Sequence, residues 1–189
     1  MKILVIENDS EEMEKAKQVL TQNGIDSVCT QDFRQASQFL GVDGFCPERK
    51  PMDKPQVDGV LSDIFFPLIK DGYFNDAFMG EDEPIGVAVA TICREQKLPC
   101  ILVTSQFHHG AKLQWVTMMV RALGMPEIED QYPNESSKPW KRGLEALLEL
   151  IQKESKMKSS KLFKGGVVYL EASSTYGFTD FEIVCGKST

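Results

Sequence analysis

The chain has 189 residues, of which 42% are hydrophobic and 26% charged, a composition typical of one folded domain and not of a disordered or membrane-embedded chain. Its formal net charge of −7 argues against nucleic acid as a partner, because DNA and RNA binding depend on clustered basic side chains. Five cysteines without a C-x-x-C pair indicate reduced thiols, and no apolar run is long enough for a signal sequence or a membrane span. We therefore expect a cytoplasmic domain without a nucleic-acid or membrane partner.

The first third of the chain alternates short apolar runs with helical patterns. Residues 3–6 form a β-branched run typical of a strand that is covered on both faces. Asp9 can cap the helix that follows, with Glu12 at its third position, and Gly24 ends that helix. The same patterns then predict a strand over 25–30, a helix over 32–40 and a strand over 57–62.

The alternation continues in the rest of the chain. It predicts a helix over 85–96, a strand over 99–104, a helix over 113–123 and a last helix from Trp140, which has the most regular apolar stripe. Residues 125–137 stand where a fifth strand is expected, but they are rich in Pro, Glu and Asn, so that strand is only weakly indicated. Alternating strands and helices predict an α/β fold with a doubly wound parallel sheet.

Three segments depart from this compact pattern. Two long loops are expected at 41–56 and 68–84, and the second carries several aromatic residues that suit either a lid or docking surface or simple packing of the loop itself. After residue 155 a polar linker leads to two β-prone runs, 166–170 and 181–185. We therefore divide the chain into a domain over 1–155 and a linker with a C-terminal β-hairpin extension over 156–189.

Polar residues stand where three of the predicted strands end. Glu7, Asn8 and Asp9 follow the first strand, Asp63 follows the strand over 57–62, and Thr104 ends the strand over 99–104. Each also has a structural interpretation, such as capping for Asp9 or a β-branched strand residue for Thr104. Because ligands bind outside the carboxyl ends of parallel strands, these residues together predict a functional site.

Four motifs, in this order, resemble the receiver domain of two-component response regulators over roughly residues 2–155. They are Lys2-Ile-Leu-Val-Ile-Glu-Asn-Asp9, the segment 57–67 around Asp63, Pro99-Cys-Ile-Leu-Val-Thr104-Ser105 and Lys138-Pro139-Trp140. The resemblance implies a flavodoxin-like sheet with strand order 2-1-3-4-5, to which the C-terminal β extension would be added.

The resemblance also implies a role for each site residue. Asp63 would be the phosphoacceptor, Thr104 would donate its hydroxyl to a phosphoryl oxygen, and Lys138 would pair with the same group. Glu7, Asn8 and Asp63 would bind Mg²⁺, which offsets charge during phosphoryl transfer. The implied partners are a histidine kinase or phosphotransfer protein and an output protein, with a homodimer left open. The peptide bond before Pro139 would often be cis.

Two residues depart from the family pattern and leave alternatives open. Asn8 stands where the family has an aspartate, which removes one negative charge and should weaken metal binding, and Tyr132 lies farther from Lys138 than the family's switch aromatic. The chain could therefore be a pseudo-receiver, a constitutive protein-binding module without phosphorylation. An enzyme that turns over at Asp63 is disfavoured, since residues 64–66 offer no general acid or base. We expect a signalling switch and not an enzyme.

Overall fold

The computed structural model describes residues 1–42, 55–70, 82–105, 113–126 and 128–162, with side chains described as far as residue 156. Five parallel strands form one sheet in the order β2-β1-β3-β4-β5. The elements in chain order are β1 (Lys2–Ile6), α1 (Ser10–Gln22), β2 (Asp26–Thr30), α2 (Phe33–Leu40), β3 (Gly59–Asp63), α3 (Ile85–Gln96), β4 (Cys100–Thr104), α4 (Gln114–Ala122), β5 (Glu129–Asp130) and α5 (Trp140–Leu162). The flavodoxin-like doubly wound sheet and its strand order are confirmed.

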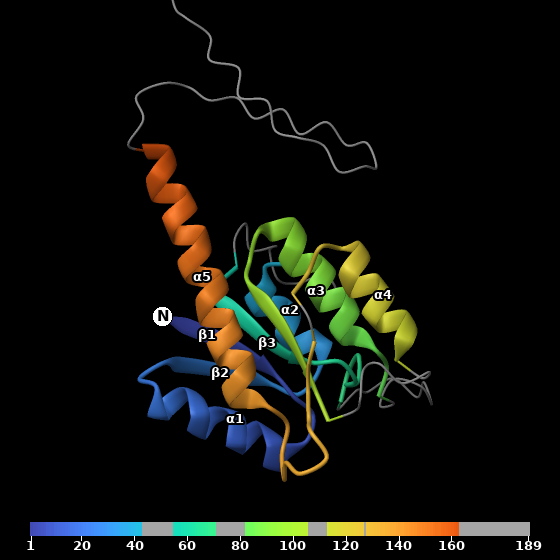
Figure 1. Cartoon of the computed structure of the whole chain (residues 1–189). Coiled ribbons are helices and arrows are strands. Elements are labelled where there is room, and N and C mark those ends of the chain that lie inside the picture. The colour runs from blue at the N-terminus through green and yellow to red at the C-terminus, as the bar shows by residue number, and fades with distance from the viewer. Residues whose placement is uncertain (43–54, 71–81, 106–112, 127, 163–189) are drawn as a thin grey trace, which may run out of the picture.

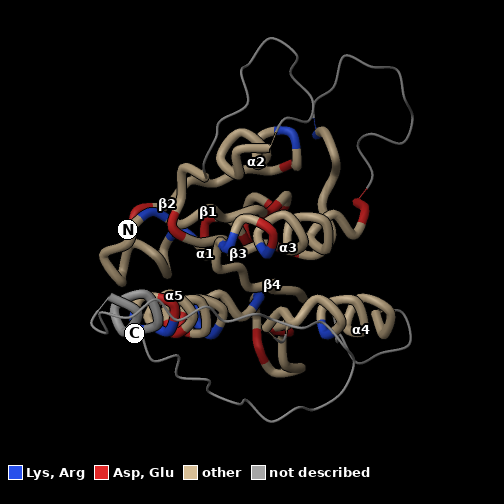
Figure 2. Tube along the Cα trace, turned by 90° about the horizontal axis from the view of Figure 1, so that it is seen from above, with Lys and Arg blue, Asp and Glu red and all other residues tan. Residues whose placement is uncertain are grey.

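Helices cover both faces of the sheet. Successive side chains of β1 alternate between two apolar clusters: Ile3 and Val5 pack with α1 and α5, whereas Leu4 and Ile6 pack with α2, α3 and α4. Figure 1 shows these helices around the sheet, and Figure 2 shows α5 and α4 on opposite sides of β4. Burial on both faces explains why the central strands β1, β3 and β4 have continuous apolar runs and not an alternating pattern. No helix of the described part of the chain is long and apolar enough to cross a bilayer.

The start of α1 agrees with the prediction from the sequence, whereas the end of α5 does not. Asp9 caps α1 as predicted, accepting the N–H groups of Glu11 and Glu12 at 2.8 and 3.0 Å. The helix α5, however, continues to Leu162 through residues where a linker was expected from 156. The segment 154–162 has no Gly or Pro to stop a helix. The runs 166–170 and 181–185, predicted as a hairpin, lie outside the described residues.

The two ends of the insertion predicted at 68–84 lie side by side, shortly after Asp63 in the structure. Phe66 and Glu83 form an antiparallel bridge, with N···O distances of 3.1 and 3.3 Å in the two directions. The carbonyl groups of Pro67 and Leu68 accept the N–H groups of Phe33 and Arg34, which begin α2 and have no partner within the helix. Both ends of the insertion are therefore anchored, while residues 71–81 lie outside the described part.

Gly86 allows α3 to begin in close contact with the end of β3. Its N–H donates to the carbonyl of Ile64 at 3.0 Å. A Cβ atom at this position would lie 2.3 Å from the carbonyl oxygen of Asp63 and 2.7 Å from Cα of Ile64. Both contacts are with backbone, which cannot move aside without displacing Asp63.

We predict that Gly86→Ala destabilises the chain by about 1–3 kcal/mol, because the added methyl overpacks this contact. Helix propensity alone would change stability by up to about 1 kcal/mol in the opposite direction. Urea denaturation measures the difference, with Ala88→Gly at an exposed position of the same helix as a control for propensity. A more stable Gly86→Ala variant would show that the close contact does not exist.

Candidate functional site

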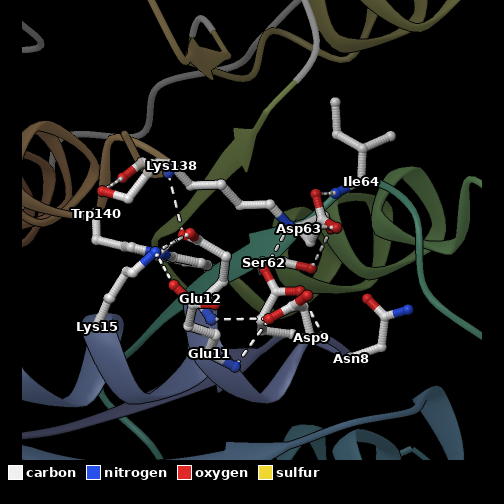
Figure 3. A network of polar contacts seen from close by, with 12 residues as sticks. Asn8, Asp9, Glu11, Glu12, Lys15, Ser62, Asp63, Ile64, Lys138 and Trp140 are labelled. Carbon is white, nitrogen blue, oxygen red and sulfur yellow. Dashed lines mark hydrogen bonds and ion pairs between the residues drawn. The ribbon is translucent and has the colours of Figure 1, made fainter. Parts of the chain in front are cut away.

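Glu7 and Asp63 come together at the carboxyl edge of the sheet because β1 and β3 are neighbours. The register pairs Ile6 with Ser62, so the next residue of each strand is an acid. Both acids are buried, with 0% and 5% of their surface exposed. Lys138 Nζ lies 2.5 Å from Glu7 Oε2 and 2.8 Å from Asp63 Oδ2. Figure 3 shows the Lys138 side chain extending to Asp63. The structure therefore unites three of the residues that the sequence predicts for the site.

The pKa of each of these three groups depends on the charge of at least one of the other two. Burial, and after it the negative charge of Asp63, raise the pKa of Glu7 from 4.5 to about 7, although the Lys138 ammonium opposes both. Burial likewise raises the pKa of Asp63, against the effects of Lys138 and of the N–H groups of Ile64 and Phe65. Burial lowers the pKa of Lys138, but the charges of Asp63 and Glu7 outweigh it and leave the pKa raised. Lys138 is therefore a charged ammonium at neutral pH.

Asp63 is held by both carboxylate oxygens. Oδ1 accepts the N–H of Ile64 at 2.7 Å, while Oδ2 faces the ammonium of Lys138. Ser62 Oγ donates to the carbonyl of Asp63 at 2.7 Å, which fixes the adjoining backbone. A carboxylate oriented in this way, with a cation beside it, has the arrangement that a nucleophile toward an anionic phosphoryl group requires.

Thr104 lies at the same edge of the sheet. Asp63 pairs with Val103 of β4, so Thr104 is one residue farther along and ends the neighbouring strand, where it is buried. Its carbonyl accepts the N–H of Gln131 at 3.0 Å, directly after β5. The register thus places Thr104 at the carboxyl edge of the sheet, as the sequence predicts, on the strand between β3 and β5.

Asn8 is the one predicted site residue whose side chain has a different partner. Its Nδ2 donates to Asp82 Oδ1 at 2.7 Å, and its carbonyl accepts from Lys70 Nζ at 3.0 Å. Both partners flank residues 71–81 of the insertion, one at each end. The side-chain amide of Asn8 is therefore engaged by the insertion and not by the Glu7–Asp63 pair.

The residues fit Mg²⁺ in part. Oxygens of Glu7 and Asp63 converge on one point, which the Lys138 ammonium takes, and Mg²⁺ in proteins is held by one or two carboxylates together with water and phosphate. Asn8 does not join them in this arrangement. Across the described residues, no group of three or more His, Cys, Asp or Glu is placed to hold a metal ion. Glu7 and Asp63 thus suit the cation as a pair, whereas the third predicted ligand does not.

Glu12 is a residue of the site that the sequence does not reveal. Its Oε2 accepts the main-chain N–H of Lys138 and the indole N–H of Trp140, both at 3.0 Å. The capping-box contact expected of Glu12 is absent, because the N–H of Asp9 donates to Glu7 Oε1 at 2.9 Å. The two ends of this link are more than 120 residues apart in sequence, so only the fold brings them together.

The loop between β5 and α5 is shaped by Arg142. Its guanidinium binds the carboxylates of Glu129 and Glu135 and the carbonyl of Asp130. The ring of Tyr132 stacks on the same guanidinium, 4.2 Å from ring centroid to Cζ, and is half exposed. The Tyr132 ring therefore packs on Arg142. The peptide bond before Pro139, in the same loop, is trans and not the cis form that the resemblance implies.

The raised pKa of Glu7 predicts how stability depends on pH. The folded chain holds this proton up to about pH 7, whereas the unfolded chain releases it near pH 4.5. The stabilisation from the proton is complete below pH 4.5 and is lost as the pH rises to about 7, by up to about 3 kcal/mol. We predict that Glu7→Gln flattens the fall in unfolding free energy across this window.

Urea denaturation at several pH values, in buffer without divalent cations, measures this dependence. Glu11→Gln, which removes an exposed acid four positions away, is the control and should keep the slope of the wild type. An equal slope in wild type and Glu7→Gln would show that Glu7 ionises normally.

No protein-family model matches the chain, and no curated protein matches it in sequence. Solved structures do match it. The CheY-like receiver domain protein from Methanospirillum hungatei has a TM-score of 0.52 at 14% identity, over 82% of this chain and 97% of that one. The receiver domain of Francisella response regulator 1452 and that from Clostridium thermocellum each have a TM-score of 0.51 at 16% identity, over 81% and 82% of this chain and 98% of theirs. The chain therefore has the fold of response regulator receiver domains, as its motifs predict.

Proposed function

We propose that this chain is a signalling switch that accepts a phosphoryl group on Asp63. The observation that supports this most is the position of Asp63: a buried carboxylate at the carboxyl end of a central strand, 2.8 Å from a buried ammonium and beside a second acid. Burying such a set is costly unless every charge is paired, so it is unusual in a purely structural role. The receiver fold around it agrees with this use.

Each residue of the site has its own role in the proposed phosphoryl transfer. An oxygen of Asp63 attacks the phosphorus of a phosphohistidine on a histidine kinase or phosphotransfer protein. The O–P bond forms as the N–P bond breaks, and the imidazole leaves and takes up a proton. The Lys138 ammonium, released from the carboxylate that has reacted, pairs with the phosphoryl oxygens, and the Thr104 hydroxyl donates to one of them. The N–H of Ile64 keeps the carboxyl group oriented throughout.

A divalent cation belongs to this proposal. Glu7 and Asp63 would hold Mg²⁺, whose charge would lower the repulsion between the carboxylate and the incoming phosphoryl group. The half-protonated state of Glu7 near pH 7 means that a cation has to displace both a proton and the Lys138 ammonium. We therefore expect binding of Mg²⁺ to strengthen as the pH rises above 7.

Relay of the signal through protein contacts completes the proposal. The negative net charge disfavours nucleic acid as the output target. On α4, Trp115, Met118 and Met119 are exposed by 47%, 65% and 46%, and large apolar side chains grouped on a surface are typical of protein contacts. A homodimer is one form that such a contact could take.

A second candidate function has an observation of its own. The Lys138 ammonium already contacts both carboxylates, Glu7 is partly protonated near pH 7, and the side-chain amide of Asn8 is bonded to Asp82. A site whose charges are balanced without a metal ion suits a pseudo-receiver. Such a chain is a constitutive protein-binding module that keeps the fold but is not phosphorylated. Asn8, in place of an acid, is the residue that separates the two candidates.

Incubation with acetyl phosphate and Mg²⁺, followed by intact-protein mass spectrometry, distinguishes them. We predict that the wild type gains one phosphoryl group, that Asp63→Asn gains none, and that Asn8→Asp gains it faster because it restores a charged ligand. Gain in Asn8→Asp alone would favour the pseudo-receiver. No gain in either, or gain that persists in Asp63→Asn, would contradict phosphorylation at Asp63.

A further inference from the structure

Glu12 stands apart from the other acids of α1 because its carboxylate faces a distant loop and not solvent. It lies in the first turn of the helix, and its side chain is 15% exposed, against 81% for Glu11 beside it. One oxygen, Oε2, accepts from both Lys138 N and Trp140 Nε1, and the other accepts from Lys15 Nζ at 2.8 Å (Figure 3). A single carboxylate thus satisfies donors from two segments of the chain.

The neighbouring residues leave Glu12 available for this link. Asp9 accepts the first N–H groups of α1, and Glu7 accepts the N–H of Asp9, so no donor of the helix end requires Glu12. On the other side, the ring of Trp140 is buried in the cluster under α5, and its indole N–H needs an acceptor. The link is therefore the natural partner for two otherwise unsatisfied donors.

Lys138 is held at both ends as a result. Its main-chain nitrogen is bonded to Glu12, and its ammonium is bonded to Glu7 and Asp63. A lysine side chain has four rotatable bonds, so the ammonium alone does not define where the loop lies. With the backbone fixed by Glu12, the ammonium has a defined place over the acceptor carboxylate.

We infer that Glu12 is a positioning residue that holds Lys138 in place at Asp63 and thereby links α1 to the acceptor site. Its part in phosphoryl transfer rests on the function proposed above, whereas its part in holding Lys138 does not. Removal of the Glu12 carboxylate would free the loop, make the Lys138 amine more accessible and slow the reaction of Asp63.

The chain supplies a matched control for this test. Glu11 precedes Glu12 on the same helix turn and also binds Lys15, at 2.9 Å, but its described contacts do not include the loop at 138–140. Glu12→Ala and Glu11→Ala therefore both remove one charge and one contact with Lys15. Only Glu12→Ala removes the acceptor for Lys138 and Trp140.

The first measurement is the rate at which a limiting amount of acetic anhydride acylates Lys138 in the full chain, quantified by peptide mass spectrometry. We expect a rise of about tenfold in Glu12→Ala, as for the loss of a hydrogen bond to a charged group, and little change in Glu11→Ala. Equal rates in the two variants would overturn the inference.

A second variant separates this role from a general loosening of the fold. Trp140→Phe keeps a ring in the core but removes the indole N–H that Glu12 binds. If the link is shared, the double variant Glu12→Ala with Trp140→Phe acylates no faster than Glu12→Ala alone; additive effects would point to a general loss of stability and would overturn the inference.

The reaction with acetyl phosphate then tests the link to function. Phosphorylation of Asp63 should slow in Glu12→Ala and not in Glu11→Ala, and equal rates would again contradict the inference. If the wild type takes up no phosphoryl group, the proposed function fails, but the acylation of Lys138 still decides whether Glu12 holds it.

Discussion

One ammonium group compensates two buried carboxylates, and the rest of the site depends on that arrangement. Two buried acids would repel each other and lose most of their hydration, which costs several kcal/mol for each ion. The chain offsets this cost with the Lys138 ammonium, with the N–H groups of Ile64 and Asp9, and with partial protonation of Glu7. These contacts offset the cost of burial, and the proposed phosphorylation of Asp63 would change the charge balance that they maintain.

The fold brings these groups together from three separate parts of the chain. The strand order places β1 beside β3, so that Glu7 and Asp63 follow paired residues. Lys138 lies on the loop before α5. Glu12 of α1 binds the backbone of that loop at Lys138, and Arg142 of α5 binds its Glu135. Beside Asp63, the start of α3 packs against the backbone of residues 63 and 64 through Gly86, and the insertion begins a few residues farther along the chain. Asp63 therefore has four parts of the chain around it: the end of β1, the loop that carries Lys138, the start of α3 and the insertion.

The insertion gives this chain a feature of its own beside the receiver fold. It is closed by the pairing of Phe66 with Glu83, and its two ends contact Asn8, once through Asp82 and once through Lys70. Asn8 is also the position where the chain departs from the family's acidic pattern. The insertion and the residue that departs from this pattern are thus joined by hydrogen bonds.

Much of the fold could be predicted from the sequence, because the central strands β1, β3 and β4 are buried on both faces and the helices have apolar stripes. The strand-end positions of Glu7, Asp63 and Thr104 followed from those strands, and Lys138 followed from its motif. The length of α5 was not predicted, since polar residues without Gly or Pro suit a linker and an exposed helix equally well. The partner of Asn8 and the link from Glu12 to Trp140 could not be predicted, because they join side chains that only the folded chain brings together.

The most direct test of this account is the stability of Lys138→Met, which keeps much of the apolar stem but removes the ammonium. With Lys141→Met at an exposed position as the control, urea denaturation at pH 8 should show a loss of roughly 3–5 kcal/mol for Lys138→Met, because two buried carboxylates lose their cation. Addition of Glu7→Gln and Asp63→Asn should restore most of that loss. If Lys138→Met is no less stable than Lys141→Met, Lys138 does not compensate the two acids, and the account of the site is wrong.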